Sequence, residues 1–317
     1  MVEKKVFVLI LFLLLFIHII CMIKTYKTET FLDNRIELHD WWGNSDEDND
    51  MFIQKICSGV IDKYNKINIY SVFGNKEVIT KPKQLNIQIS GESYYRDTNL
   101  FDINFIPEPM DKKKNIINFP YAVTYIFTKN IDLQKFTTPR VLPINKIKTK
   151  FCLFSVSNCS CEPRNQIFNE LSKYKLVDSC GSCMNNMTCP GGTRNFASDD
   201  YCEFIGNYKF MICFENKSEH NYFTEKMIIS FSCGTIPIYW GCSNIEEYVN
   251  MDAILYLPPN YTEKDMNQLI EKIKYLDNNE TAYKKMYDTY LFKDGKLPDC
   301  FDIKKIQNQI ENVLQNE

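Results

Sequence analysis

The chain has 317 residues, more than one domain usually contains, so two domains are the first expectation. Hydrophobic residues make up 44% of the sequence and aromatic residues 14%, which is enough to bury sizeable cores. The net charge is -3 and no block of Lys or Arg rises above the background, so we expect no nucleic-acid partner.

The N-terminus has the pattern of a membrane anchor. An apolar run over residues 6–23 would reach about 27 Å as a helix, which is just enough to cross a bilayer. A cleaved signal peptide is the alternative, but its apolar core is usually shorter and no small-x-small site follows Ile23. We therefore expect a tail at residues 1–5 and an uncleaved span at 6–23. Lysines flank the run on both sides, so charge does not orient it.

The next segments read as a linker and then a first domain. Residues 24–50 are polar and acidic, ending in "NSDEDND", and predict a solvated stem. From residue 51 to about 148, short apolar strands alternate with helix-like pieces. The strands are expected in "INIYSVFG" (67–74), "QLNIQISGE" (84–92) and "LFDINFIPE" (100–108).

The second half alternates strands and helices more regularly. A strand at 150–158 precedes a helix at 164–174, opened by Pro163, and a short strand at 175–179. The same order of strand, helix and strand is predicted again from residue 208, with Thr224 capping the start of the helix and Gly234 ending it. The remaining predicted elements are strands at 208–215, 235–241 and 253–258 and helices at 225–232, 262–277, from 280, and through Ile303, Ile306, Ile310, Val313 and Leu314. This pattern predicts a doubly wound parallel sheet.

A polar cluster lies where such a sheet binds ligands, at the carboxyl end of a strand. Lys226 falls in the first turn of the predicted helix after Thr224, and Arg164 takes the matching place in the earlier unit. Both helix starts favour an anion, so the two cations could converge on a diphosphate. Glu225 would suit hydroxyl donors of a sugar or ribose. Spacing alone leaves open a solvated lysine, a salt-bridged arginine and a glutamate that merely complements the helix dipole.

Several rare sequence motifs resemble those of one protein family. "CFEN", "YFTEK" and "GTIPIYWG" are similar to the donor-binding signature of the α-1,3/4-fucosyltransferases, glycosyltransferase family ten. "PRNQIFNELSKYKLVDSCG" resembles that family's Arg-Asn helix and following strand, and "IEKIKYLDNNETAYKKMY" its late helices. "WWG" at Trp41 to Gly43 and "SGES" at Ser90 to Ser93 resemble its acceptor-domain landmarks. The resemblance covers about residues 40–290 with gaps.

The resemblance implies a GT-B fold, in which two Rossmann-like α/β domains face a cleft. It places an acceptor-side domain at 51–149, a GDP-fucose-binding domain at 150–290 and a C-terminal helix at 291–317. It also implies a single-pass type II topology, with a cytoplasmic tail and a lumenal body in the Golgi or another secretory-pathway membrane. The implied reaction moves L-fucose from GDP-fucose to a GlcNAc-type hydroxyl of a glycan, with inversion and in α-1,3 linkage.

The family also suggests roles for individual residues. Arg164 and Lys226 would neutralise the diphosphate, and Glu225 would hold ribose or fucose hydroxyls. Tyr222 and Asn216 would line the nucleotide pocket. Asn216 is also a glycosylation sequon, and a glycan there should block the donor, so we predict that it is unused. No metal is required, because the two cations perform the neutralisation, although this leaves room for stimulation by Mn²⁺ or Mg²⁺.

An inverting transfer also needs a carboxylate that takes the proton of the acceptor hydroxyl. In the family this base follows a glycine at a strand end of the first domain, and Glu92 in "QISGES" occupies that place. The following residue is Ser93, where the family usually has Asn. The competing carboxylates are Asp97, Asp102 and Glu108.

Cysteines and sequons favour an oxidising, lumenal environment. The thirteen cysteines include a dense group between residues 152 and 202, and five sequons occur at Asn158, Asn186, Asn216, Asn260 and Asn279. Disulfides are the first interpretation, with up to twelve cysteines paired if Cys21 lies in the membrane. Buried thiols are the second, and a zinc site built from "CGSC" with Cys159 and Cys161 is the third. Cys300 stands alone where animal members carry a C-terminal Cys-x-x-Cys pair.

Two rival functions remain. A non-catalytic sugar- or nucleotide-binding descendant would keep the donor pocket and lose the base, so Glu92 discriminates it. A cysteine-rich, metal-stabilised interaction module is the other rival, and loss of zinc on chelation with unfolding would identify it.

Overall fold

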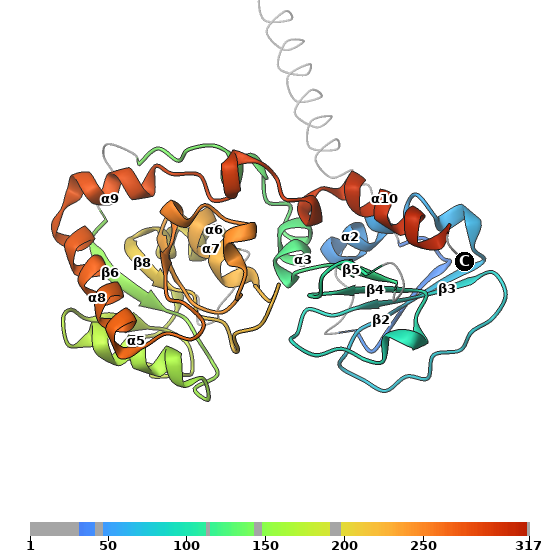
Figure 1. Ribbon diagram of the computed structural model, residues 1–317, viewed down its shortest axis with the longest axis horizontal. Coiled ribbons are helices and arrows are strands. Elements are labelled where there is room, and N and C mark those ends of the chain that lie inside the picture. Colours follow the sequence, from blue (N-terminus) through green and yellow to red (C-terminus); the bar gives the residue numbers. More distant parts are fainter. Residues whose placement is uncertain (1–31, 42–46, 112–114, 143–147, 191–197, 316–317) are drawn as a thin grey trace, which may run out of the picture.

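The computed structural model describes residues 32–41, 47–111, 115–142, 148–190 and 198–315. The tail and membrane span expected at residues 1–23 lie outside this part of the chain. Among the described helices, none combines the length and the apolar character needed to span a bilayer. Figure 1 shows two lobes side by side, each built around one sheet.

The first lobe contains a five-stranded parallel sheet whose strands follow in chain order. Its apolar face carries Ile67, Ile69 and Ile87, which are fully buried. Three helices cover this face, and one of them comes from the far end of the chain (Figure 1). The elements are β1 (Ile36–His39), β2 (Lys66–Tyr70), β3 (Gln84–Ile89), β4 (Ile103–Ile106), β5 (Ile116–Asn118), α2 (Glu47–Cys57), α3 (Tyr121–Thr128) and α10 (Ile303–Leu314).

The other face of this sheet is covered by loops instead of helices. Between β2 and β5 the described connections contain no α-helix, so their backbone groups need other hydrogen-bond partners. Buried amide side chains supply them: Gln88 accepts a bond from the backbone N–H of Arg96 at 2.6 Å, and Asn104 donates to the carbonyl of Thr98 at 3.1 Å. The first lobe therefore departs from the Rossmann-like pattern predicted for it, while the parallel sheet itself is confirmed.

The second lobe has the doubly wound form that the sequence predicts. Its parallel strands run in the order β10-β9-β8-β6-β7, which reverses direction between β6 and β8. Helices α5, α8 and α9 pack on one face, and α6 and α7 pack on the other. The elements are β6 (Lys150–Phe154), α5 (Glu162–Ser172), β7 (Val177–Ser179), α6 (Asp199–Gly206), β8 (Tyr208–Ile212), α7 (Glu225–Ser232), β9 (Ile236–Tyr239), β10 (Leu255–Tyr256), α8 (Glu263–Asn278) and α9 (Glu280–Tyr287).

Local sequence explains why these helices begin where they do. Pro163 lies in the first turn of α5, where its missing N–H costs nothing. Thr262 and Asp265 form a reciprocal capping box at the start of α8. Ser198 and Asn279 cap α6 and α9 by accepting backbone N–H groups of the first turn.

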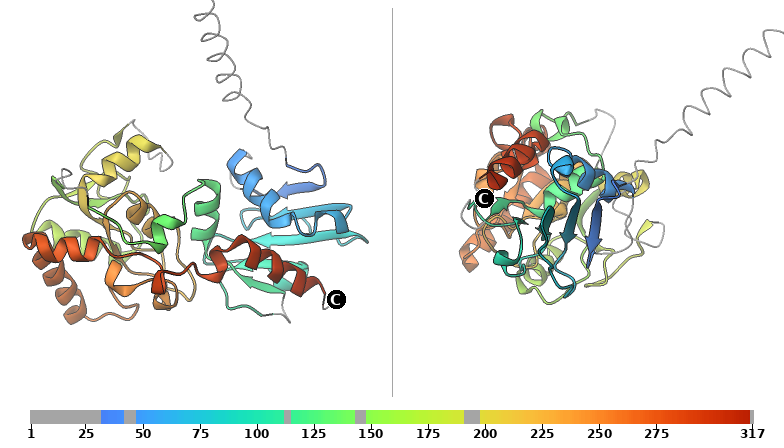
Figure 2. Two further views of the ribbon diagram at one scale, coloured as in Figure 1. Left: turned by 90° about the horizontal axis from the view of Figure 1, so that it is seen from above. Right: turned by 90° about the vertical axis from the view of Figure 1, so that its right-hand side faces the viewer.

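The two lobes meet through α3 and through the loops after β8 and β9. The backbone N–H of Ala122 donates to the carbonyl of Phe223 at 3.3 Å. The Asn118 amide donates to the Tyr248 hydroxyl at 2.7 Å, and that hydroxyl donates to Asn221 at 2.5 Å. After α9 the chain returns along the molecule, so that α10 packs on the first lobe beside α2 (Figure 2).

Shorter elements complete the connections. A short helix, α4, lies between the lobes in sequence, and single 3₁₀ turns sit in several loops. Their bounds are α4 (Gln134–Thr137) and 3₁₀ turns at Ile61–Lys63, Thr98–Leu100, Ile245–Glu247, Met251–Ala253, Lys293–Gly295 and Asp299–Phe301.

The first sheet begins earlier in the chain than the sequence indicates. Residues 36–39, inside the predicted linker, form β1 and pair in parallel with β2. The segment "IELH" is too short and too polar to be recognised as a strand from the sequence. It forms a strand because it pairs with the buried strand β2. The predicted apolar face of the last helix is confirmed, since Ile306, Ile310 and Val313 are buried.

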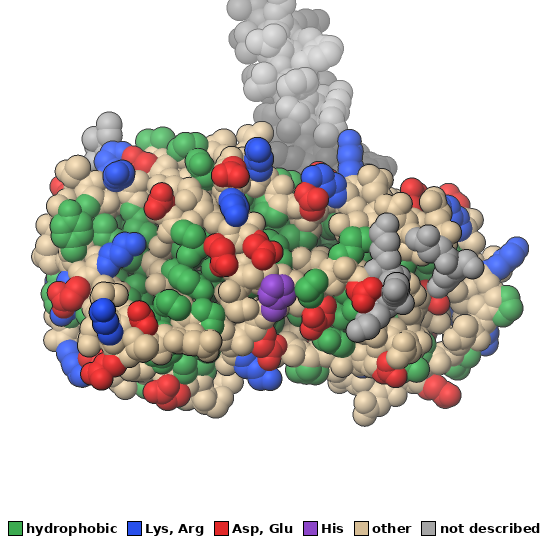
Figure 3. Space-filling model, viewed as in Figure 1, with side chains coloured by type: hydrophobic (Ala, Val, Ile, Leu, Met, Phe, Trp, Pro, Cys, Tyr) green, Lys and Arg blue, Asp and Glu red, His purple; other side chains and the backbone are tan. Residues whose placement is uncertain are grey.

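The surface seen in Figure 3 mixes charges of both signs. Lys and Arg side chains are interspersed with Asp and Glu over both lobes of that face. The described part of this face therefore presents no continuous basic stripe of the kind that follows a nucleic-acid backbone.

Candidate active site

A cavity of about 240 Å³ opens at the carboxyl ends of β6 and β8, where the strand order of the second sheet reverses. This is the place where an open parallel sheet leaves room for a ligand, because the connections from these two strands leave toward opposite faces. Arg164, Asn216, Glu225 and Lys226, all predicted from the sequence, line it together. The other lining residues are Ser155, Val156, Ser157, Asn158, Met211, Ile212 and Ile229.

Arg164 reaches the cavity from the first turn of α5. Its side chain is almost wholly buried, with 1% of the residue exposed, and its Nε donates to the carbonyl of Phe214 at 2.8 Å. Its Nη2 is buried and makes no hydrogen bond within the described part of the chain. A buried guanidinium N–H without an acceptor costs about 1 to 3 kcal/mol, so this arrangement fits an anionic ligand that would accept the bond.

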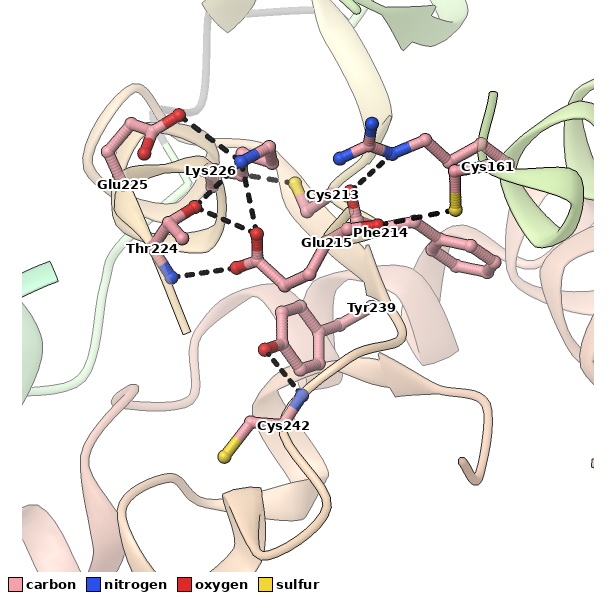
Figure 4. A network of polar contacts seen from close by, with 10 residues as sticks. Cys161, Cys213, Phe214, Glu215, Thr224, Glu225, Lys226, Tyr239 and Cys242 are labelled. Atoms are coloured by element: carbon pink, nitrogen blue, oxygen red, sulfur yellow. Dashed lines mark hydrogen bonds and ion pairs between the residues drawn. The ribbon is translucent and has the colours of Figure 1, made fainter. Parts of the chain in front are cut away.

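Lys226 enters from α7 and is held by two carboxylates. Its Nζ lies 3.0 Å from Oε2 of Glu215 and 3.4 Å from Oε1 of Glu225, and it donates to the Thr224 hydroxyl at 2.7 Å. Figure 4 shows the ammonium group between these partners. Burial disfavours the charge of Lys226, but Glu215 and Glu225 outweigh burial and raise its pKa. The site therefore holds a protonated ammonium group beside the cavity.

Thr224 occupies the cap position of α7, as predicted, but its hydroxyl has another role. It makes no capping hydrogen bond to the helix. Instead it donates to Oε2 of Glu215 at 2.8 Å and accepts from Lys226. The simple helix-cap role predicted for Thr224 is therefore wrong, because the buried carboxylate competes for the hydroxyl.

Glu92 lies on the first lobe, in the turn after β3. The buried Ser90 hydroxyl holds this turn: it accepts from the Glu92 backbone N–H at 3.2 Å and donates to the Tyr94 carbonyl at 2.7 Å. Burial raises the pKa of the Glu92 carboxyl, Lys226 opposes that shift, and Glu225 adds to it. These electrostatic effects place the Glu92 carboxyl near the cation site of the second lobe.

The glycine before this carboxylate is required by packing. A Cβ on Gly91 would lie 2.2 Å from the Tyr121 ring, so a larger residue would displace either the ring or the turn. The aromatic ring at the start of α3 thereby helps to set the position of Glu92.

The competing carboxylates of the first lobe are already engaged. Asp97 caps a 3₁₀ turn through the N–H of Asn99, and Asp102 accepts from the N–H of Asn86 at 2.6 Å. Glu108 accepts from the Tyr95 hydroxyl. By contrast, no described group donates a hydrogen bond to the Glu92 carboxylate, so among the four it is the one available for proton transfer.

The two remaining predicted residues differ in position. Asn216 is exposed and lines the cavity, whereas Tyr222 is buried and is absent from the cavity lining. Burial, Glu215 and Glu92 together raise the pKa of Tyr222, so its side chain is a neutral phenol. Asn216 therefore can contact a ligand in the cavity, whereas Tyr222 lies in the same loop but is buried away from the cavity surface.

Glu215 is the main residue that the predicted site set lacks. It is fully buried, and its two oxygens hold both Thr224 and Lys226. The sequence contains a signal for it, because a carboxylate directly follows the apolar strand in "MICFE". Its burial could not be known without the neighbouring loop.

Two disulfides occur among the described cysteines: Cys159–Cys183 and Cys202–Cys233. The first joins the loop beside the cavity to the "CGSC" segment, which removes two of the four sulfurs that a zinc site there would need. The zinc interpretation is therefore wrong for this group. Complete pairing is also wrong, since eight described cysteines lie outside the bridges and are buried: Cys57, Cys152, Cys161, Cys180, Cys189, Cys213, Cys242 and Cys300.

Comparison with known proteins now identifies this lobe. Residues 145–292 match the model of glycosyltransferase family 10 (fucosyltransferase), C-terminal part. The second lobe is therefore similar to the C-terminal domain of this family. The family resemblance predicted from the sequence is confirmed for these residues.

Three relatives show how far the family 10 likeness extends. A protein of Acanthamoeba polyphaga mimivirus, named as a fucosyltransferase, is 29% identical over 240 residues, which cover 74% of this chain and 38% of that protein. Alpha-(1,3)-fucosyltransferase FucT of Helicobacter pylori is 24% identical and aligns over 89% of this chain and 66% of its own length. GDP-fucose protein O-fucosyltransferase 3 of Xenopus laevis is 30% identical over 146 residues, 44% of this chain and 30% of that protein. The chain thus spans less than two thirds of each of these relatives.

The fold also has a solved counterpart. An alpha1,3-fucosyltransferase crystallised with GDP-fucose superposes with a TM-score of 0.66 at 21% identity, covering 89% of this chain and 90% of that one. At this identity the likeness establishes the fold: two parallel α/β lobes in the arrangement of that enzyme.

Proposed function

We propose that this chain transfers L-fucose from GDP-fucose to a glycan hydroxyl, with inversion at the sugar. The observation that carries the proposal is the convergence of Arg164 and Lys226 on one cavity, with Glu92 close enough to Lys226 to feel its charge. The solved counterpart was crystallised with GDP-fucose, which supports the choice of donor. The acceptor would be a GlcNAc-type sugar and the linkage α-1,3, as in the name of the Helicobacter pylori relative.

The proposed mechanism assigns one task to each residue. Arg164 and Lys226 hold the diphosphate and stabilise the negative charge that develops when the bond between fucose C1 and the phosphate oxygen breaks. Glu92 takes the proton of the acceptor hydroxyl while that oxygen bonds to C1 from the opposite side. Glu225 and Asn216 hold hydroxyls or the nucleotide. The products are the fucosylated acceptor, GDP and a protonated Glu92, and the account needs no metal.

The pKa of Glu92 suits this role. Burial raises the pKa of the Glu92 carboxyl, which makes its carboxylate a stronger base. The Glu92 carboxyl therefore combines a position near the cation site with an environment that favours proton uptake.

A second acceptor class has its own support. The Xenopus laevis relative is named a GDP-fucose protein O-fucosyltransferase, and its match covers 44% of this chain. A protein hydroxyl could therefore replace the sugar hydroxyl with the same donor chemistry. The alternative of a non-catalytic descendant would retain GDP binding without transfer to either acceptor.

The decisive experiment is a transfer assay with the full-length chain in detergent. GDP-fucose would be offered with a panel of N-acetyllactosamine, chitobiose-core and folded-domain acceptors, and both GDP release and product mass would be measured. We expect Glu92→Gln to bind GDP as the wild type does and to lose about 10²- to 10⁴-fold in turnover. Wild-type GDP binding with no transfer to any acceptor would favour the non-catalytic descendant.

We also propose that the protein is a single-pass type II membrane protein of the Golgi or another secretory compartment. The apolar run at residues 6–23 and the two disulfides support an anchored body in an oxidising lumen. Protease protection of the body in sealed microsomes, with mass spectrometry of the five sequons, tests the topology. An accessible body would contradict it, and a glycan at Asn216 would contradict the donor-pocket role of that residue.

A further inference from the structure

Glu215 is a fully buried carboxylate directly behind the cavity. Oε1 accepts the backbone N–H of Thr224 at 2.7 Å, and Oε2 accepts the Thr224 hydroxyl at 2.8 Å and the Lys226 ammonium at 3.0 Å. Glu215 is absent from the residues that line the cavity. Any effect on a ligand must therefore pass through Lys226.

The chain makes specific room for this carboxylate. A Cβ on Gly241 would lie 2.4 Å from Cγ of Glu215, so only glycine lets the side chain pass at that point. Burying a carboxylate costs several kcal/mol unless it is paired. A neutral amide could accept the Thr224 N–H equally well. Closing the loop between β8 and α7 therefore does not explain why the buried side chain at position 215 carries a negative charge.

The two carboxylate partners of Lys226 differ in their exposure, which suggests a function for the charge of Glu215. Glu215 is 0% exposed, whereas the Glu225 side chain is 22% exposed and lines the cavity. A ligand or water can replace the Glu225 contact, but it cannot reach the Glu215 contact. Lys226 thus has one permanent and one exchangeable counter-ion (Figure 4).

We propose that Glu215 is a positioning residue whose buried charge keeps the Lys226 ammonium protonated and directed at the cavity before an anionic nucleoside diphosphate arrives. The diphosphate then takes the place of Glu225, while Glu215 stays in contact. The identity of the ligand rests on the function proposed above; the ion pair does not.

The protonation of Lys226 depends on the other charged and titratable groups around it. Arg164 shares the cavity and opposes a second positive charge, so it makes a counter-ion more necessary. Tyr222 is a neutral phenol over the pH range considered below. Glu92 faces the site from the other lobe, and Glu225 remains as the exchangeable partner. Without Glu215, burial would act against the lysine charge, and the partly exposed Glu225 and the carboxyl of Glu92 on the other lobe would remain to oppose it.

The test compares Glu215→Gln with the wild type as a function of pH. GDP affinity would be measured by calorimetry between about pH 7.5 and about pH 9.5, a range in which the terminal phosphate, with a pKa of about 6, stays ionised. Loss of a buried counter-ion should lower the pKa of Lys226 into this range. We expect the variant to lose about tenfold in GDP affinity across the range, and the wild type to change less than about twofold.

A readout without ligand separates this inference from the proposed function. In the wild type the pKa of Lys226 is raised, so its stabilising contribution persists until pH exceeds the ordinary lysine value of 10.5. In Glu215→Gln the folded-state pKa would fall below the unfolded one, so stability should rise relative to the wild type as pH increases. The unfolding midpoint of the empty full-length protein measures this. If wild-type protein fails to bind GDP, the proposed function fails, and this readout still decides the role of Glu215.

Two further variants guard against a merely structural effect. Thr224→Val removes the hydroxyl contacts but leaves the ion pair, so it should lower stability without an alkaline loss of GDP affinity. Lys226→Arg in the Glu215→Gln background supplies a cation that does not titrate and should restore a flat pH profile. A loss of affinity in Glu215→Gln that is equal at every pH, or no loss at all, would overturn the proposal.

Discussion

Replacing Arg164 by methionine should separate donor binding from stability. The change removes a buried Nη2 that has no partner in the described structure, which relieves a cost of about 1 to 3 kcal/mol. It also removes the Nε bond to the Phe214 carbonyl, which leaves that oxygen unpaired at a similar cost. These two effects nearly cancel, so the empty protein should keep its free energy of unfolding within about 1 kcal/mol.

Donor binding should respond quite differently. A charge-assisted hydrogen bond to phosphate contributes about 1.5 to 3 kcal/mol, so Arg164→Met should weaken GDP binding about 10- to 150-fold. Calorimetric titration with GDP and thermal unfolding of the same preparation measure the two quantities. A stability loss above about 2 kcal/mol with unchanged GDP affinity would show that Arg164 is a structural residue.

The protein contains a matched control. Arg140 also has a buried Nη2 without a described partner, but its Nε and Nη1 bond the carbonyls of Tyr287, Phe231 and Thr235, and its guanidinium stacks on two rings. It lines a different cavity, of about 320 Å³. Arg140→Met should therefore lower stability by about 2 to 4 kcal/mol and leave GDP affinity unchanged.

Three other changes give distinct outcomes. Glu225 raises the pKa of Glu92, and we expect the acidic limb of the kcat/KM profile to lie above pH 4.5. Glu225→Gln should therefore move this limb to lower pH. A limb that does not move would argue against Glu92 as the base. Gly241→Ala should displace Glu215 and cost about 1 to 3 kcal/mol in thermal unfolding, and wild-type stability would contradict the close approach. Lys226→Ala should weaken GDP binding by about 1.5 to 3 kcal/mol, and an unaltered dissociation constant would refute its phosphate role.

Local signals in the sequence predicted most of the second lobe. The strands predicted at 150–158 and 208–215 start where β6 and β8 start, because each is an apolar run after a polar turn, but both observed strands end earlier, at Phe154 and Ile212. Pro163 and Thr224 mark the helix starts that follow. Since the carboxyl ends of parallel strands share one edge, this reading also predicted that Arg164 and Lys226 would meet, and both do line one cavity.

The first lobe was harder to predict because its connections carry little periodicity. β1 is four residues long and becomes a strand only by pairing with β2. The loops over the polar face fold against Gln88 and Asn104, whose amides look like ordinary strand residues in the sequence. Nothing local indicates that such residues will be buried.

The sequence by itself predicted the order of elements in the second lobe, the two cations that line its cavity and the family resemblance, because these depend on short-range patterns and on rare motifs. The tertiary structure alone decided how charge is balanced around the cavity. It buried Glu215 behind Lys226, left Nη2 of Arg164 without a described partner, and brought Glu92 near charged residues more than a hundred positions away. The electrostatics of the site depend on distance and burial, which only the packing of the two lobes fixes.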